Sequence, residues 1–397
     1  MRIVVVGASL AGVRTVQGLR RRGSDAEVVL VGDEPGTRDG VAADRPPLSK
    51  EVLADPSTAP TPLAGPGALA DLDVRLVTAR ATDLDLGRRA VVLHGGEELP
   101  YDALVLATGS APRALPGLGP RPGVHLLRTA ADALAVRAAA LPGRRVVVVG
   151  GGFIGTEVAW TLHAAGCPVT LVEPLPALLL RGLGPQLGAA LTRRHVAAGV
   201  DVRLGVSVAS VEGGDDRVTG VTLTDGSLLP ADVVVLGLGT VPATDWLAGS
   251  GLDLRDGVVC DERLAARGAR DVFAVGDLAR WHHPRYGEDV RVEHWTNAVE
   301  TAGVVAAGLT GTPTVHDAVP YVWSDQLGTR VQVVGRVRPS DEVRVVHGDL
   351  AGPFVALTGG DGRLSAAVGV GAARALLPYR KLLARGAAWD EAVGAGA

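Results

Sequence analysis

Two glycine-rich turns carry the clearest chemical signal in this sequence of 397 residues. Gly150, Gly152 and Gly155 complete a G-x-G-x-x-G pattern directly after a β-branched run, and Glu173 follows 18 positions after the last glycine. Such a turn lets the backbone approach a pyrophosphate and offers it the free N–H groups of a helix N-terminus, while the acid accepts from a ribose hydroxyl. The spacing therefore predicts a dinucleotide site.

Glu173 also indicates which dinucleotide binds there. A carboxylate accepts a hydrogen bond from a ribose 2′-hydroxyl but repels a 2′-phosphate. We therefore predict NADH as the ligand of this turn and NADPH as the poorer one.

A second, less complete copy of the pattern lies at the N-terminus. Gly7 and Gly12 follow another β-branched run, but Ser9 stands where the middle glycine would be. The Ser9 hydroxyl either bonds a phosphate oxygen or is only small enough to be tolerated. Asp33 and Glu34 compete as the ribose acceptor, and we rank Asp33 first. Either turn alone fits a plain glycine turn equally well, whereas two copies, each with its acid, favour two dinucleotide sites.

The elements that must position these turns are the strands and helices of an α/β fold. Each turn lies between a β-branched run and a helical stretch, which is typical of a parallel strand buried on both faces and followed by a crossover helix. A chain of this length holds two or three domains. We therefore predict an α/β protein with two Rossmann-like dinucleotide-binding domains.

Composition argues against several other classes of protein. Formal net charge is only −4, from 39 basic and 43 acidic residues, and no long basic run suggests nucleic acid as a partner. Cys167 and Cys260 form no disulfide framework, and His282, His283 and His294 match no usual metal-ligand spacing. No apolar run reaches the roughly 18 residues of a membrane span. We expect a soluble, cytoplasmic protein with no metal and no membrane partner, and the oligomeric state stays open.

Several short segments together resemble one family, the FAD-dependent NAD(P)H:ferredoxin reductases, which includes putidaredoxin, rubredoxin and Rieske-ferredoxin reductases. The Arg-Pro-Pro-Leu-Ser-Lys and Trp-Ser-Asp-Gln segments are typical of this branch. Ala-Thr-Gly and Gly-Asp are shared with the wider superfamily of flavoproteins that have two dinucleotide-binding domains. The matching stretches are DRPPLSK at 44–50, YDALVLATG at 101–109, the turn at Gly150, VFAVGD at 272–277, EHW at 293–295 and WSDQ at 323–326.

The resemblance implies a domain layout and a set of cofactor contacts. An FAD-binding domain, residues 1–112 and 240–315, is split by an inserted NAD-binding domain, residues 113–239, and a C-terminal α+β interface domain covers residues 316–397. The residues implied for FAD are Gly7, Ser9, Ala11, Gly12, Asp33, Glu34, Lys50, Ala81, Thr108, Gly109, Arg128, Asp277 and Trp295. Those implied for NAD are Gly150, Gly152, Phe153, Ile154, Gly155, Glu173 and Gly239.

Lys50 is one of only two lysines in the chain, the other being Lys381. The resemblance implies that Lys50 approaches the flavin N5 edge and pairs with Glu157, and that Trp295 and Trp323 lie next to the flavin. These four residues form the expected catalytic set. A compact ammonium on a flexible stem suits this place better than the broad fork of an arginine. Lys381, which belongs to no motif, is expected to be an ordinary surface lysine.

The segment from Asp33 to Lys50 contains no cysteine, although related disulfide reductases carry one beside the flavin. Reduced flavin must then pass electrons directly to an acceptor. The resemblance implies hydride transfer from NADH to FAD, followed by two single-electron steps to a ferredoxin of [2Fe–2S] or similar type that supplies a P450 or Rieske oxygenase. The alternatives are an NADH oxidase or quinone reductase, and an NADH-sensing flavoprotein similar to apoptosis-inducing factor, which we rank last.

Two departures from the family pattern bear on the flavin pocket. Val41, Ala42 and Ala43 stand where relatives often carry Pro-Tyr, and Val322 stands where Phe is common. Smaller side chains at these positions predict a looser pocket.

Overall fold

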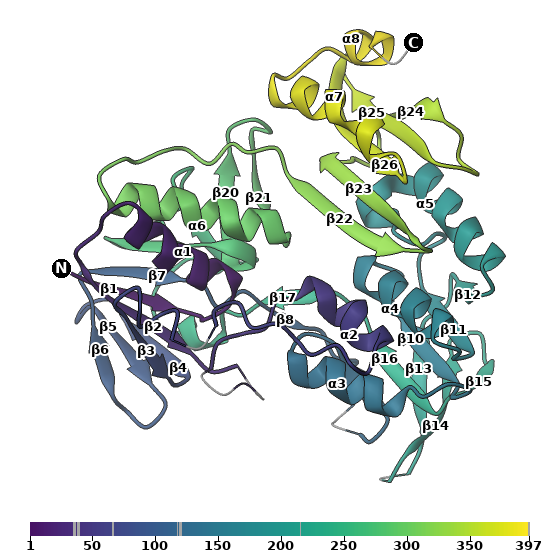
Figure 1. Ribbon diagram of the computed structural model, residues 1–397, viewed down its shortest axis with the longest axis horizontal. Helices are drawn as coiled ribbons and strands as arrows, with labels where there is room; N and C mark the ends of the chain where they lie inside the picture. The colour runs from purple at the N-terminus through teal and green to yellow at the C-terminus, as the bar shows by residue number, and fades with distance from the viewer. Residues whose placement is uncertain are drawn as a thin grey trace.

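The computed structural model describes residues 1–34, 37, 40–65, 67–116, 118, 121–214 and 216–395. These residues build two five-stranded parallel sheets and one five-stranded antiparallel sheet, each with its own helices, and several smaller sheets (Figure 1). The N-terminal parallel sheet lies on one side of the molecule, the second parallel sheet on the other, and the antiparallel sheet next to the second (Figure 1).

The N-terminal sheet is parallel throughout, as its buried runs of Val, Ile and Leu require. Its strand order is β3 (Val74–Thr78), β2 (Glu27–Gly32), β1 (Arg2–Val6), β7 (Ala103–Leu106) and β19 (Val272–Ala274). Helix α1 (Leu10–Arg21) follows β1 and packs on α6 (Trp295–Leu309). A Cβ on Gly18 would lie 2.9 Å from the Ala306 Cβ, so this glycine lets the two helices approach closely.

A small antiparallel sheet and several short elements complete this part of the molecule. The core that they share with the parallel sheet includes Leu84, Val91 and the buried Trp281. The small sheet is formed by β4 (Ala81–Asp85), β5 (Ala90–Leu93) and β6 (Glu98–Pro100). The short elements are η2 (Asp245–Leu247), β18 (Val258–Cys260), η3 (Gly276–Leu278), β20 (Ala279–His283) and β21 (Glu288–Arg291). Two further short helices, η1 (Pro46–Ser49) and α2 (Glu51–Ala54), instead reach the core of the second parallel sheet.

The second parallel sheet repeats this plan and is inserted between β7 and β19 of the first. Its strand order is β12 (Asp201–Leu204), β11 (Val169–Glu173), β10 (Val146–Val149), β16 (Val233–Leu236) and β9 (Val124–Leu126). The helices of its core are α3 (Ala130–Ala139), α4 (Phe153–Ala164) and α5 (Leu180–Ala197). A separate core joins the sheet to the antiparallel strands β13 (Val208–Gly213), β14 (Val218–Leu223) and β15 (Leu228–Pro230).

The chain crosses between the two parallel sheets at one place. Strand β8 (Ser110–Pro112) leaves the first sheet, β17 (Thr240–Pro242) returns to it, and the two pair antiparallel in the middle of Figure 1. This pairing holds the ends of the inserted segment together.

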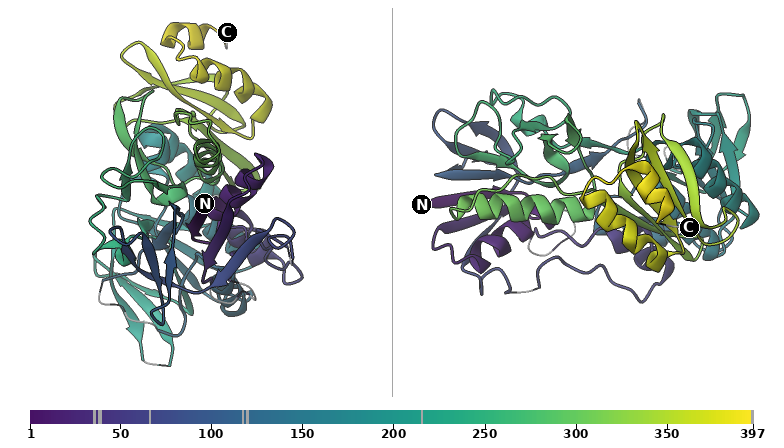
Figure 2. Two further views of the ribbon diagram at one scale, coloured as in Figure 1. Left: turned by 90° about the vertical axis from the view of Figure 1, so that its left-hand side faces the viewer. Right: turned by 90° about the horizontal axis from the view of Figure 1, so that it is seen from above.

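The C-terminal sheet is antiparallel and buries both faces. Its strand order is β22 (Tyr321–Gln326), β23 (Thr329–Gly335), β26 (Arg363–Val370), β25 (Phe354–Gly360) and β24 (Glu342–Gly348). Val333 and Phe354 join the core of α4 and α5, whereas Val334 and Val355 face α7 (Ala373–Ala384) and α8 (Trp389–Gly394). Seen from above, α6 runs towards this C-terminal unit (Figure 2).

The predicted fold class is confirmed. Both glycine turns lie between a central parallel strand and a helix, and the C-terminal unit mixes an antiparallel sheet with two helices. Within the part of the chain that the structure describes, no helix is both long and apolar enough to cross a bilayer.

Candidate functional site

The outer glycines of both turns are required by the packing of the protein itself. Gly7 has φ +118°, and a Cβ there would lie 2.3 Å from the Ala107 carbonyl oxygen. A Cβ on Gly12 would lie 1.9 Å from the Gly7 carbonyl oxygen, and the equivalent distance from Gly155 to Gly150 is 1.8 Å. These glycines hold strand, turn and helix in close contact, as the sequence pattern predicts.

The middle position of each turn behaves differently. A Cβ on Gly152 would meet no atom within 4 Å, so the packing of this chain does not explain the glycine. Gly152 is the N-cap of α4, so no side chain caps this helix. Ile154, two positions further on, is 48% exposed. Ser9, the N-cap of α1, likewise makes no cap hydrogen bond. Open space beside free helix N–H groups fits the close approach of a pyrophosphate.

Glu173 is tied to the second turn by its own carboxylate. The side chain is buried, and it accepts hydrogen bonds from the backbone N–H groups of Gly151, at 2.6 Å, and Leu175, at 2.9 Å. Both bonds fix the acid at the end of β11, beside Gly152 and the N-terminus of α4.

The two acids after β2 have different surroundings. Glu34 is 11% exposed and binds Arg45 through both carboxylate oxygens, at 2.5 and 2.9 Å. Asp33 is 44% exposed and pairs with Arg80 at 2.9 Å. Asp33 is therefore the more accessible of the two.

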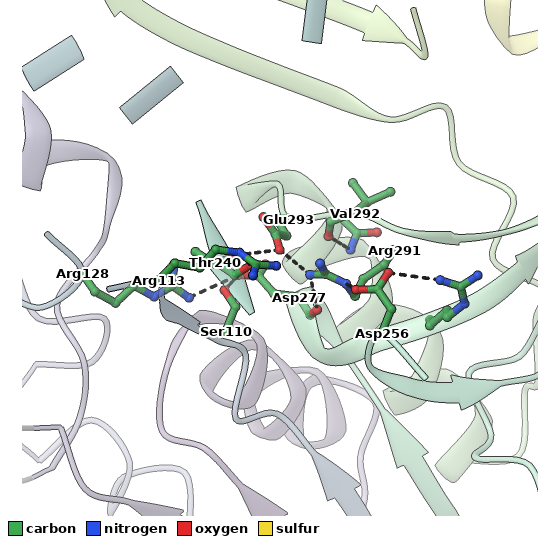
Figure 3. Close-up of polar contacts among 11 residues, drawn as sticks. Ser110, Arg113, Arg128, Thr240, Asp256, Asp277, Arg291, Val292 and Glu293 are labelled. Atoms are coloured by element: carbon green, nitrogen blue, oxygen red, sulfur yellow. Dashed lines mark hydrogen bonds and ion pairs between the residues drawn. The ribbon is translucent and has the colours of Figure 1, made fainter. Parts of the chain in front are cut away.

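Asp277 lies at a junction of three segments (Figure 3). Its Oδ2 accepts a hydrogen bond from the Ser110 hydroxyl, at 2.7 Å, and pairs with Arg128 Nη2, at 3.1 Å. Ala11 lies close by, because a Cβ on Gly276 would be 3.1 Å from the Ala11 Cβ. The structure thus brings the first turn, the Gly-Asp segment and Arg128 together.

The other residues that the resemblance implies have the following places in the fold. Thr108 donates its hydroxyl to the Ala243 carbonyl, at 3.0 Å, and Gly109 lies against Arg128, at 3.5 Å from its ideal Cβ. Ala81 begins β4, Phe153 is the first residue of α4, and Gly239, with φ +82°, directly precedes β17.

Lys50 and Glu157 form an ion pair between the two halves of the molecule. The Lys50 Nζ lies 2.9 Å from Glu157 Oε2 and donates to the Pro46 carbonyl at the same distance. The side chains are only 12% and 3% exposed. Glu157 also accepts hydrogen bonds from the hydroxyls of Ser49 and of Ser324, the latter at 2.6 Å. This carboxylate therefore joins segments of all three units.

Trp295 and Trp323 are in contact with each other. Their rings are edge-to-face with centroids 6.0 Å apart, and Trp323 stacks on Tyr321 at the same separation. Trp295 Nε1 donates to the Asp44 carboxylate at 2.9 Å. Burial lowers the pKa of the preceding His294 to about 4, so this ring is neutral at pH 7.

The structure places many of the predicted residues in two groups, here called cradles, and in one ion pair. The first cradle contains the Gly7 turn and Asp277, the second contains the Gly150 turn and Glu173, and the ion pair joins Lys50 to Glu157 on α4, the helix that follows the Gly150 turn. Sequence reasoning missed Asp44, Ser49, Ser110 and Ser324, although three of these belong to the motif segments.

The side chains at the positions that depart from the family pattern, Val41–Ala43 and Val322, are not exposed. Val41, Ala42 and Ala43 are buried, and Val322 is half-buried against the core of the second sheet.

Sulfur takes no part in the described site. Cys167 and Cys260 are free and buried, and burial raises the pKa of the Cys260 thiol to about 12. The Cys167 pKa is raised for the same reason. Thiols held protonated are poor nucleophiles. Among the described residues, no cluster of three or more His, Cys, Asp or Glu side chains could hold a metal ion.

Comparison with known proteins places this geometry in a family. The family described as pyridine nucleotide-disulphide oxidoreductase matches residues 1–302, and the reductase C-terminal family matches residues 321–396. The putidaredoxin reductase CamA of Pseudomonas putida is 38% identical over 359 residues, covering 88% of this chain and 84% of that protein. The ferredoxin–NAD(+) reductase component of the anthranilate 1,2-dioxygenase system of Burkholderia cepacia is 37% identical over 396 residues, covering 98% and 95%.

A solved structure gives the same result. The crystal structure of the covalent putidaredoxin reductase–putidaredoxin complex superposes with a TM-score of 0.91 at 35% identity, covering 96% of this chain and 92% of that chain. Fold and site therefore define an oxidoreductase with two nucleotide-binding turns. The chain belongs to the pyridine nucleotide-disulphide oxidoreductase family, and within it to the ferredoxin reductases.

Proposed function

We propose that this chain transfers electrons from NADH through FAD to an iron–sulfur ferredoxin, which supplies a P450 or a Rieske oxygenase. The observation that carries the proposal is the buried Lys50–Glu157 pair, because it joins the two halves that hold the nucleotide turns. The names of the relatives, a putidaredoxin reductase and the reductase component of a dioxygenase system, support the acceptor class.

FAD is assigned to the domain formed by residues 1–112 and 240–315. The Gly7 turn and Ser9 would hold its pyrophosphate, the accessible Asp33 its adenosine ribose, and Asp277 its ribitol chain. Two hydrogen bonds to Asp277 support its assignment, because both reach Oδ2. No bond from the described residues reaches Oδ1, which leaves this oxygen to accept from a ribitol hydroxyl. Thr108, Gly109 and Arg128 are assigned to the same site, supported by the contacts of Gly7 with Thr108 and of Arg128 with Gly109 and Asp277, and Ala81 is assigned to it from the resemblance alone.

NADH is assigned to residues 113–239, on the turn from Gly150 to Gly155. The open space beside Gly152 and the exposed Ile154 support this assignment. The buried Glu173 favours NADH over NADPH, because a 2′-phosphate would place a second negative charge beside a carboxylate that is fixed in place.

Bound FAD supplies the chemistry, since it accepts a hydride from NADH and gives up electrons singly to an iron–sulfur centre. The protein supplies position and shielding. Glu157 holds the Lys50 ammonium, and Trp295 with Trp323 would shield bound flavin from water. Residues 316–397 are assigned as the interface domain. The two free thiols support a reducing compartment such as the cytoplasm.

Reoxidation of the reduced flavin tests the proposal. Purified protein is reduced anaerobically with NADH, and a [2Fe–2S] ferredoxin, a quinone or air is then added while flavin absorbance is followed. Fast reoxidation by ferredoxin alone is expected. Fast turnover with quinone or air but not with ferredoxin would favour an oxidase or quinone reductase. Slow reoxidation of the flavin by every acceptor would favour an NADH sensor.

A further inference from the structure

A line of buried polar side chains leads from Glu157 into the apolar interior. Ser324 donates to Glu157 Oε1 at 2.6 Å, Gln326 Nε2 donates to the Ser324 hydroxyl at 3.0 Å, and His195 Nε2 lies 2.8 Å from Gln326 Oε1. All four side chains are buried. The line joins α4, β22 and α5, and Lys50 pairs with its carboxylate end.

In every hydrogen bond of this line, the donor lies on the side farther from Glu157 and the acceptor on the side nearer to it. A carboxylate only accepts, so the Ser324 hydroxyl must donate to it and accept from the Gln326 amide. The Gln326 carbonyl oxygen then also only accepts, so His195 must carry its proton on Nε2. The other ring nitrogen, Nδ1, is buried without a hydrogen-bond partner. Because burial also lowers the His195 pKa, the ring is a neutral donor.

Strand β22 separates two kinds of contact. Ser324 and Gln326 face α4 and α5, whereas Tyr321 and Trp323 lie on the opposite face and contact each other. Residues two positions apart on a strand lie on the same face, so Tyr321 and Trp323 share one face and Ser324 and Gln326 share the other. One strand thus carries an aromatic face and a face that holds Glu157.

The surroundings of His195 are apolar. It lies on the buried side of α5 together with the core residues Leu187 and Leu191. Burying an imidazole and a carboxamide here costs free energy unless both are hydrogen-bonded, and apolar side chains of similar size would fill the space at lower cost. Packing alone therefore does not explain this pair.

We propose that His195 and Gln326 are positioning residues, which orient the Ser324 hydroxyl and through it the Glu157 carboxylate and the Lys50 ammonium. The proposal rests on the function proposed above, in which Lys50 and Glu157 serve hydride transfer from NADH. A fixed donor keeps the carboxylate in one orientation, and small losses of alignment slow a transfer that depends on geometry.

The test is the rate constant of flavin reduction by saturating NADH, measured by anaerobic stopped-flow. Ser324→Ala is expected to slow it about tenfold, and His195→Leu and Gln326→Met at least about threefold, with the Kd for NADH unchanged. His195→Gln, which can present an amide N–H to Gln326, should restore most of the rate. In the double variant His195→Leu/Ser324→Ala, the rate should equal that of Ser324→Ala, because His195 acts only through Ser324.

His163→Leu is the matched control, since it removes a histidine from the same helix as Glu157 but outside the line of hydrogen bonds. It should leave the rate constant unchanged. If His195→Leu does not fold, the rate constant of Gln326→Met tests the proposal instead. Wild-type rates in Gln326→Met, or effects of His195→Leu and Ser324→Ala that multiply in the double variant, would overturn the proposal. Failure of NADH to reduce the wild-type flavin would instead reject the proposed function.

Discussion

At the scale of single residues, Lys50 depends on an acid that lies in a different part of the chain. Its ammonium and the Glu157 carboxylate are both largely withdrawn from solvent. In Lys50→Met the carboxylate keeps its burial and loses its counter-charge. We expect the free energy of unfolding to fall by about 3 kcal/mol and flavin reduction by NADH to slow by at least about tenfold.

Chemical denaturation and stopped-flow spectroscopy measure these two effects. The chain provides its own control, because Lys381 is the other lysine and is exposed on α7. Lys381→Met should change neither quantity. Equal effects of the two substitutions would contradict the role given to Lys50.

Glu173 carries the prediction about coenzyme preference. Its carboxylate is held by the N–H groups of Gly151 and Leu175, so it cannot swing away from an added phosphate. Glu173→Gln removes the negative charge and keeps the size. The ratio of kcat/KM for NADPH to that for NADH should rise about tenfold, which corresponds to about 1.4 kcal/mol. Steady-state kinetics with both coenzymes checks this, and an unchanged ratio would show that the charge does not select NADH.

At the scale of elements, the turn between β10 and α4 contains glycines needed for folding and one, Gly152, whose role we propose is to bind the coenzyme. A Cβ on Gly152 meets open space, whereas a Cβ on Gly155 would lie 1.8 Å from the Gly150 carbonyl oxygen. Gly152→Ala should therefore leave the melting temperature unchanged and raise the Kd for NADH, because the new methyl group occupies space for the pyrophosphate. Gly155→Ala should lower the melting temperature sharply. Equal losses of stability in both variants would show that Gly152 is needed only for packing.

The elements around this turn were predictable from sequence, because their signals are local. The β-branched run, the glycines and the acid of each copy lie within one βαβ unit, and their spacing alone indicates the turn. The surroundings of Glu157 were not predictable in this way. Ser324 is 167 positions away from it, and His195 meets Gln326 across 131 positions. The motifs contain Ser324 and Gln326 but do not show what they face, and His195 belongs to no motif.

At the scale of the whole molecule, buried neutral histidines make stability depend on pH. His316 is buried against Trp281 and bonded to Asn297, and burial lowers its pKa to about 4. The unfolded chain takes up this proton near pH 6.5, so between pH 6.5 and 4 the unfolded state binds more protons than the folded state.

The free energy of unfolding should therefore fall as pH falls through this range, by up to about 3 kcal/mol for His316. The buried His283, whose pKa burial also lowers, acts in the same direction. Denaturation curves at several pH values between 7.5 and 4.5 measure this. In His316→Gln the pH dependence should be weaker, and an identical slope would exclude His316 as a contributor.

The whole molecule combines the two cradles, the Lys50–Glu157 ion pair and a C-terminal sheet that reaches this pair, with both cysteines buried and protonated. The central claim is that electrons pass from NADH through FAD to a ferredoxin without a redox thiol. Anaerobic titration tests it most directly, with the enzyme in catalytic amount, a [2Fe–2S] ferredoxin in excess and NADH added stepwise. Each NADH should reduce two ferredoxin molecules, equally well in the double variant Cys167→Ala/Cys260→Ala. A protein that binds no flavin, or a folded double variant that no longer reduces ferredoxin, would contradict the claim.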